Sequence, residues 1–354
     1  MLSYISDKLC GFCMAEGWAQ SGMNRIRKLL LLLLWLPLLL SGCAQRESSR
    51  DFFAMDTVMQ LRAYGPAAEA ALARAEEEIY RLEGELSCRR EEAALARLNA
   101  AGGGIVTEET AALLKTALAV CEETGGAYDP ALGALMQAWG FAGGAFCVPE
   151  PDTLAALANQ SGQSRVQLDG CRVTLTDGAQ LDLGGIAKGY AAGCVREILT
   201  DAGVSSALLS LGGNVAAIGT KPDGSDWIVG LQDPDDPQTY FGTVSVRDAC
   251  VVTSGGYQRF FEQDGVRYHH ILDPKTGYPA ESGLKSVSVI AADDTLADAL
   301  STALFVMGLQ DGAALQKTGG LSFEAVFVTE ENAVWITPGL AGCYQSDRSY
   351  QILP

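Results

Sequence analysis

Two short segments place polar groups where a phosphate and a divalent cation can bind. In the first, Leu181–Tyr190 (LDLGGIAKGY), Gly184 and Gly185 precede a predicted helix that carries Lys188 one turn inside. Unpaired backbone amides at a helix N-terminus, together with a lysine, suit an anion and above all a phosphate. Glycine is also common where an ordinary helix begins, so this segment alone leaves a plain capping role open.

The second segment is a predicted helix over Asp294–Met307. Asp298, Ser301 and Thr302 lie at positions i, i+3 and i+4 and therefore share one face. One carboxylate and two hydroxyls form an oxygen-only site that suits Mg²⁺ bridging to substrate phosphates. The alternative is an aspartate stabilised by the helix dipole, with both hydroxyls bonded back to carbonyl groups. The sequence alone does not choose between the two.

The chain contains only 2 histidines, His269 and His270, and they are adjacent. Neighbouring side chains of a strand point to opposite faces, so at most one of them serves a given site. The turn sequence Asp273–Gly277 follows them. A histidine beside a turn is suited to act as a general base near neutral pH, and a hydrogen-bonded structural imidazole is the alternative.

Helices and strands predicted from periodicity must position these groups. Helices are predicted at Ala67–Leu86 and Glu108–Thr124, and the alternation over Phe52–Tyr64 predicts one strand. From Arg165 onward the chain is strand-rich, and helices interrupt it only at about 186–202 and 294–307. This order predicts an α+β fold of mixed, mainly antiparallel sheets with flanking helices, because a doubly wound parallel sheet needs regular strand–helix alternation.

The N-terminal segment has the pattern of an export signal. After Met23, three basic residues precede the uncharged run Leu29–Leu40, which is too short to span a bilayer. The following Leu40–Cys43 (LSGC) looks like a lipobox, so we expect synthesis to start at Met23 and the mature chain at lipidated Cys43. An exported protein, anchored to the cell membrane and facing the extracytoplasmic side, is predicted.

The domain organisation follows from this leader. We expect a leader over residues 1–43, a polar tether over 44–50 and one main domain over 51–354. The glycine-rich stretch 143–151 is the best candidate for an internal boundary.

Charge and cysteine content exclude several functions. Four of the 25 basic and two of the 43 acidic residues lie in residues 1–43, which leaves a net charge of about −20. Such a surface disfavours nucleic acid and anionic lipid as partners. The cysteines beyond Cys43 show neither CxxC nor regular spacing, so they support neither a zinc site nor a disulfide framework, and we expect buried thiols.

Several blocks, in this order, resemble the ApbE family, the FAD:protein FMN transferases. The resemblance runs from MDTVM at Met55 to the final strands. It includes TGGAYDPALGALMQAWGF, LDLGGIAKGY, SLGGNVAAIG, TSGGYQRFF, HHILDPKTGYP and ADALSTALFVMG. It implies an ApbE-like fold and an enzyme that uses Mg²⁺ to transfer FMN from FAD to a threonine or serine hydroxyl of a target flavoprotein. The products would be a phosphoester and AMP.

The resemblance also implies roles for individual residues, matched motif by motif. The metal ligands would be the Gly185 carbonyl, Asp298, Ser301 and Thr302. The residues lining FAD would be Met55, Ala127, Tyr128, Asp129, Asp182, Lys188 and the Ile271–Leu272 backbone. His270 and Asp298 would be catalytic, with His270 as the base that activates the acceptor hydroxyl. Arg89 departs from the family pattern, since it falls where an aromatic side chain often packs on the flavin.

Two alternative functions remain open at this point. In a Mg²⁺-dependent FAD pyrophosphatase, water replaces the acceptor hydroxyl and the products are FMN and AMP. A flavin-binding lipoprotein without catalysis belongs to a different class. For a transferase, the resemblance implies acceptors among flavin-carrying subunits of membrane complexes of the Rnf or Na⁺-translocating NADH:quinone reductase kind, or among extracellular flavoproteins.

Overall fold

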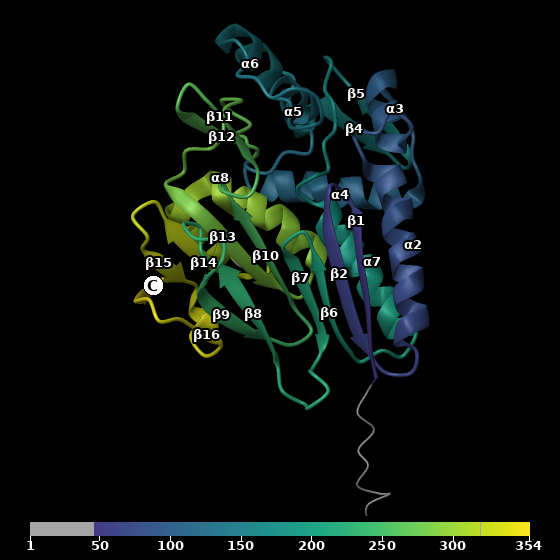
Figure 1. Cartoon of the computed structure of the whole chain (residues 1–354). Helices are drawn as coiled ribbons and strands as arrows, with labels where there is room; N and C mark the ends of the chain where they lie inside the picture. Colours follow the sequence, from purple (N-terminus) through teal and green to yellow (C-terminus); the bar gives the residue numbers. More distant parts are fainter. Residues whose placement is uncertain (1–45, 319) are drawn as a thin grey trace, which may run out of the picture. The chain divides into compact units, whose positions relative to one another are not determined.

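A large, mainly antiparallel sheet organises the fold (Figure 1). The computed structural model describes residues 46–318 and 320–354. Within these residues the sheet has 9 strands in the order β1-β2-β6-β7-β10-β13-β14-β15-β17, and only β15 and β17 pair in parallel. The strands are β1 (Glu47–Ala54), β2 (Thr57–Tyr64), β6 (Ser206–Leu211), β7 (Asn214–Gly219), β10 (Cys250–Gly255), β13 (Leu284–Ala291), β14 (Glu324–Thr329), β15 (Val334–Ile336) and β17 (Tyr350–Ile352).

Three smaller sheets complete the β structure of the described residues. One consists of β16 (Tyr344–Gln345), β9 (Tyr240–Val246) and β8 (Trp227–Gln232), and a second of β3 (Gly103–Ile105), β5 (Arg172–Leu175) and β4 (Val166–Asp169). The third is the hairpin of β11 (Phe260–Gln263) and β12 (Val266–His269). Phe261 and Tyr268 of this hairpin pack on a small core around Trp139 and Phe141.

Helices cover one face of the large sheet and build the main core. They are α2 (Ala68–Leu86), α7 (Ala187–Asp201) and α8 (Asp294–Thr318). The other face packs against β8 and β9 through a second core. The remaining helices are α3 (Ala94–Ala101), α4 (Glu108–Glu123), α5 (Gly133–Ala138) and α6 (Pro151–Ala158), with 3₁₀ turns at Gln163–Arg165 and Pro338–Leu340.

The predicted α+β class with mainly antiparallel sheets is confirmed, but the single strand predicted over Phe52–Tyr64 is wrong. It is a hairpin, in which Ala54 pairs with Thr57 across a two-residue turn. Met55 and Asp56 in that turn have φ of 48° and 63°. Positive φ at both central positions is typical of a type I′ turn, whose backbone twist matches that of the two flanking strands.

The domain limits also differ from the expectation. Residues 47–50, expected in the tether, form the first half of β1, because they pair with the end of β2. Arg46–Pro354 form one compact unit, which the stretch 143–151 does not divide; residues 143–150 are a loop, and Pro151 begins α6. The expected leader and Cys43 lie outside the described residues.

Two further sequence expectations concern cysteines and membrane spans. The cysteines of the described chain are all free thiols, but only Cys121 and Cys250 are fully buried, and Cys147 is exposed. Among residues 46–318 and 320–354, no helix combines the length and the apolar character needed to cross a bilayer.

Helices α7 and α8 approach closely at Gly189. A Cβ atom at this position would lie 2.2 Å from the Asp294 carbonyl oxygen and 2.6 Å from the Asp298 Cβ. The Gly189 N–H donates a hydrogen bond of 2.8 Å to Asp298 Oδ2. Nearby, Arg196 of α7 donates two hydrogen bonds, of 2.7 and 2.9 Å, to Asp294 and ties the start of α8 to α7. The glycine therefore sets the distance at which α7 holds the Asp298 carboxylate.

Replacing this glycine is expected to push the two helices apart. We expect Gly189→Ala to lower the free energy of unfolding by about 1–3 kcal/mol, as overpacking usually does. Gly193 is the matched control, because a Cβ there meets only Thr295 Oγ1, at 4.0 Å. Since alanine favours helix by up to about 1 kcal/mol over glycine, Gly193→Ala should be neutral or stabilising. Urea denaturation of both variants measures this, and equal effects would contradict the close contact.

Candidate functional site

A cavity of about 660 Å³ brings together most of the residues selected from the sequence. It lies where the β1–β2 turn, the β6–β7 turn, the start of α7, the middle of α8 and the segment after β12 meet. The predicted site residues lining it are Met55, Ala127, Tyr128, Asp129, Asp182, Gly185, Lys188, His270, Ile271, Leu272, Asp298 and Thr302. Ser301 does not line it, and Cys43 lies outside the described residues.

The loop that leads into α7 is held by its own hydrogen bonds, and no side chain of the described residues caps the helix itself. The Gly184 N–H donates to Asp182 Oδ1 over 2.7 Å, and the Cys88 thiol donates to Asp182 Oδ2 over 3.2 Å. Partial burial, and then the charge of Asp182, raise the pKa of Cys88, so it stays a thiol. Lys188 donates to the Gly184 carbonyl over 3.2 Å. The Gly184 amide is therefore already used within this loop, and Lys188 lies beside it on the cavity wall, where it can meet an anion.

Lys188 also links this helix start to α8. Its Nζ lies 4.0 Å from Asp298 Oδ1, and the Asp298 side chain is only 5% exposed. A buried carboxylate needs a partner of opposite charge or several donors. Lysine at the limit of ion-pair distance and one backbone N–H leave Asp298 with unused acceptor capacity on the cavity side.

The two hydroxyls of α8 differ: Ser301 fits the interpretation as a structural hydroxyl, and Thr302 fits the interpretation as a cation ligand. Ser301 is fully buried, donates to the Asp298 carbonyl over 2.8 Å and lies 2.8 Å from Ser254 Oγ of β10. It therefore bonds back to the helix, as in the structural alternative. Thr302 lines the cavity, and a Cβ on Gly185 would lie 3.2 Å from its Oγ1. Asp298, Thr302 and the Gly185 backbone thus converge as oxygen donors.

Tyr128 forms a wall of the same region. Its Cε2 would lie 3.3 Å from a Cβ on Gly185, and its buried hydroxyl has no hydrogen-bond partner within the described chain. Burial, and then the negative charges of Asp298 and Asp182, raise the pKa of Tyr128 well above its ordinary value. The hydroxyl therefore stays protonated, and a bound group must satisfy it.

Two other predicted residues support the cavity wall through their own bonds. Asp129 is buried and accepts from the Ala131 N–H over 2.8 Å and from the Gly162 N–H over 2.7 Å. Burial raises the pKa of this carboxyl. The Met55 N–H donates to Glu83 Oε1 over 3.1 Å, which attaches the hairpin turn to α2. Both residues hold the shape of the cavity.

The two histidines face different cavities, which confirms that only one of them serves this site. His270 lines the cavity described above, whereas His269 lines another and packs edge-on against Phe305 at 5.5 Å. His270 Nδ1 lies 3.1 Å from the Arg259 carbonyl oxygen. Because a carbonyl only accepts, Nδ1 carries the proton and Nε2 keeps a free lone pair.

The surroundings of His270 keep its ring neutral. Desolvation, and then the positive charges of Arg259 and Lys188, lower the pKa of His270 to about 3. A neutral imidazole with a free Nε2 is the form that accepts a proton.

Arg259 and Arg89 form a cationic rim that the sequence analysis did not assemble. Both guanidinium groups donate to the Phe141 carbonyl oxygen, and both lie beside the Asp56 carboxylate. Desolvation, and then the charge of Arg89, lower the pKa of Arg259. Arg259 lies in the block TSGGYQRFF. A basic residue in a block that precedes the two histidines was the signal by which the sequence could have indicated it. Asn214, in SLGGNVAAIG, was also missed.

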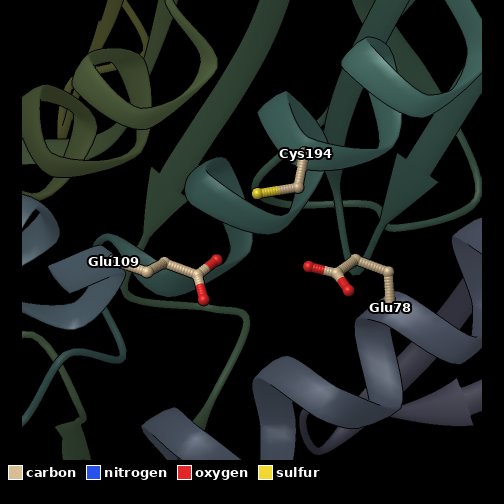
Figure 2. A group of neighbouring side chains, drawn as sticks. All are labelled: Glu78, Glu109 and Cys194. Carbon is tan, nitrogen blue, oxygen red and sulfur yellow. The ribbon is translucent and has the colours of Figure 1, made fainter. Parts of the chain in front are cut away.

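A second group of side chains of the kinds that bind metals lies outside this cavity. Glu78 of α2, Glu109 of α4 and Cys194 of α7 face one another across the helix contact (Figure 2). Arg81 bridges both carboxylates, at 2.6 and 2.8 Å, and Arg81 lowers the pKa of Glu78. Burial raises the pKa of Cys194 to about 11, so it is a thiol. The group is an ion-paired helix contact.

Comparisons with known proteins agree on one family. The sequence model of the ApbE family matches residues 55–327. The FAD:protein FMN transferase of Treponema pallidum is 40% identical over 322 residues, covering 83% of this chain and 88% of that protein. The FAD:protein FMN transferase of Klebsiella pneumoniae is 36% identical over 294 residues, which cover 80% of this chain and 90% of that protein. The ApbE protein of Thermotoga maritima superposes with a TM-score of 0.77 at 34% identity, covering 82% and 96%.

NMR can test the electrostatics of His270 directly, because only 2 imidazoles need assignment. We expect the His270 ring to stay neutral, with the proton on Nδ1, down to about pH 4, since its pKa is lowered to about 3. Arg259→Gln removes a positive neighbour and should move this pKa upward, while the backbone carbonyl stays in place. Titrating ¹⁵N-histidine spectra of both proteins measures the shift. A His270 that titrates near pH 6.5 in the wild type would contradict the arrangement.

Proposed function

Because this chain belongs to the ApbE family, we propose that it is an FAD:protein FMN transferase that moves the FMN half of FAD onto a hydroxyl of a target flavoprotein. The observation that carries the proposal is the convergence, in one cavity, of a neutral imidazole at His270 with the oxygen donors of Asp298, Thr302 and Gly185. Transfer from a pyrophosphate needs a base for the acceptor and charge neutralisation for the phosphates.

We propose Mg²⁺ as the cation of this site. The donor set fits, because Asp298, the Thr302 hydroxyl and the Gly185 carbonyl are hard oxygen ligands and Asp298 has unused acceptor capacity. Ser301, the fourth predicted ligand, is held by Ser254, so we assign it to supporting α8. When bound, the cation supplies positive charge to the pyrophosphate and the departing AMP.

The chain's own residues then account for the proton and for orientation. We propose a threonine or serine as the acceptor, whose oxygen attacks the FMN phosphorus while its proton moves to His270 Nε2. The Oγ–P bond forms, the P–O bond to AMP breaks, and its electron pair leaves with AMP. The Arg259 carbonyl fixes the ring through Nδ1. A negatively charged pyrophosphate near Lys188 and Arg259 offsets the charges that lower the pKa of His270, which makes Nε2 a stronger base.

The remaining predicted residues surround FAD in this proposal. Met55, Ala127, Tyr128, Asp182, Lys188 and Leu272 line the cavity, which at about 660 Å³ falls in the range of cofactor sites. Lys188 is placed to meet phosphate oxygens, and the protonated Tyr128 hydroxyl is available to donate to the ligand.

Activity should depend on His270 and Asp298 but not on the neighbouring histidine. The chain from Gln45 onward is incubated with FAD, with and without Mg²⁺, and with a threonine-bearing acceptor domain. We expect a Mg²⁺-dependent mass gain of the acceptor equal to FMN, with release of AMP. His270→Ala should lower the rate by about 10²–10⁴-fold, because it removes the base, and Asp298→Ala by about 10³-fold or more.

His269→Ala is the matched control, because this ring lines the other cavity, and it should keep the wild-type rate. AMP and free FMN without labelled acceptor would mean that the protein is an FAD pyrophosphatase. If neither AMP nor FMN is formed, the protein binds flavin without catalysis. Full activity of both the His270 and the Asp298 variants would refute the assigned roles.

We also propose where the enzyme works. Residues 1–43 would direct export, and lipidated Cys43 would anchor the domain on the extracytoplasmic side of the membrane. Its acceptors would be flavin-carrying subunits of membrane complexes of the Rnf or Na⁺-translocating NADH:quinone reductase kind, or extracellular flavoproteins. An acidic domain anchored by lipid at Cys43 would reach such substrates at the membrane surface.

The anchor can be tested by one substitution. Because acyl chains at Cys43 would supply the membrane affinity, Cys43→Ser should move the protein from the membrane fraction to the soluble fraction. Fractionation of cells that express each form, with labelled fatty acid, measures this. Retention of the variant in the membrane without label would contradict the lipobox.

A further inference from the structure

Asn214 has an unsatisfied amide group directed into the same cavity. It is the first residue of β7 and is 4% exposed, and it lines the cavity. Its Nδ2 is buried and has no hydrogen-bond partner within the described residues. A buried N–H without an acceptor costs free energy, so native structures nearly always supply a partner.

Another asparagine of this chain shows what a structural role looks like. Asn99 donates from Nδ2 to the Leu181 carbonyl over 2.8 Å and accepts at Oδ1 from the Leu181 N–H over 2.8 Å. Both ends of its amide therefore hold the backbone at Leu181 in place. The Asn214 Nδ2 has no such bond within the described chain, which leaves a group in the cavity as its acceptor.

Strand alternation places Asn214 on the face that carries the candidate metal ligands. Ala216 and Ile218, which follow it at alternate positions, belong to the core beneath the helices, so Asn214 shares that face. On the neighbouring strand β10, Ser254 points to the same side and lies 2.8 Å from Ser301 of α8. Asn214 therefore faces the part of α8 that presents Asp298 and Thr302 to the cavity.

The backbone holds the amide in this position. Leu211 pairs with Asn214 across a turn formed by Gly212 and Gly213, whose φ values are 62° and 96°. A Cβ on Gly212 would lie 2.5 Å from Thr57, so the turn is packed against the neighbouring hairpin. The backbone that carries Asn214 is thus held in place beside the cavity.

We propose that Asn214 Nδ2 donates a hydrogen bond to a phosphoryl oxygen of the substrate pyrophosphate. The inference rests on the proposed function, since that function brings a pyrophosphate to the Asp298 and Thr302 face. No group of the described residues accepts from Asn214 Nδ2, so the missing partner is an acceptor, which an oxygen of the ligand would supply. A phosphoryl oxygen is charged, and donors to charged oxygens form the stronger bonds.

Ligand binding by two variants tests this proposal. Asn214→Asp keeps the shape but removes the donor and adds negative charge, and Asn214→Leu removes both ends of the amide. In the presence of Mg²⁺, both should weaken binding of FAD and of ADP by about 10–100-fold, the effect of losing a bond to a charged group. Binding of riboflavin, which has no phosphate, should change by less than about 2-fold. Calorimetric titration measures all three ligands.

Thermal unfolding separates a binding role from a structural one. Asn214→Leu should unfold at or above the wild-type temperature, because the amide makes no bond that the fold needs. Asn99→Leu is the contrasting control and should unfold at a lower temperature, because it breaks two backbone bonds. Wild-type affinity of the Asn214 variants for ADP would overturn the inference, and so would an equal loss of riboflavin and ADP or a fall in stability like that of Asn99→Leu.

The outcomes also separate this inference from the proposed function. Binding is measured without acceptor protein, so a wild type that binds FAD but transfers no FMN refutes the transferase and still tests Asn214. A wild type that transfers FMN, with Asn214 variants that bind and transfer equally well, refutes only the role of Asn214. A wild type that binds neither FAD nor ADP refutes both.

Discussion

The buried carboxylate of Asp298 is the constraint on which the site depends. A carboxylate on a side chain that is only 5% exposed must be paired or hydrogen-bonded, because desolvating a lone charge costs on the order of several kcal/mol. This chain gives it one close donor, the Gly189 N–H, and a lysine at 4.0 Å. The glycine contact brings α7 and α8 together, and with them Lys188, Gly185 and Thr302. This incomplete pairing leaves Asp298 with unused acceptor capacity toward the cavity.

The charges around the cavity follow from the same arrangement. Basic and acidic groups are mixed in the lining of the cavity, which contains Lys188, Arg89, Arg90 and Arg259 together with Asp56, Glu83, Asp129, Asp182 and Asp298. Without a ligand, desolvation and then the positive charges of Arg259 and Lys188 lower the pKa of His270, and the ring stays neutral. In the proposed function, a pyrophosphate bound near Lys188 and Arg259 would add negative charge, so substrate binding would make His270 a stronger base through the local field.

The sequence predicted those parts of the site that depend on local spacing. The i, i+3, i+4 pattern of α8 identified Asp298 and Thr302, because helix geometry alone places them on one face. It did not predict that Ser301 turns to Ser254, whose strand is fixed by pairing with distant segments. The β1–β2 turn was missed because Met55 and Asp56 adopt positive φ without glycine, and the apolar alternation continues across them. Asn214 and Arg259 reach the cavity only through sheet topology.

Arg89 shows how this chain changes a family feature without losing the cavity. An aromatic ring at that position would pack through its face and carry no charge, whereas Arg89 is held as a planar group by the Phe141 carbonyl and the Asp56 carboxylate. A guanidinium plane can still stack on a ring system. Its charge, however, acts on Arg259, whose pKa it lowers, and Arg259 in turn acts on His270. At a position where the resemblance implies an aromatic ring, Arg89 thus places a charged group between Asp56 and Arg259 at the edge of the cavity.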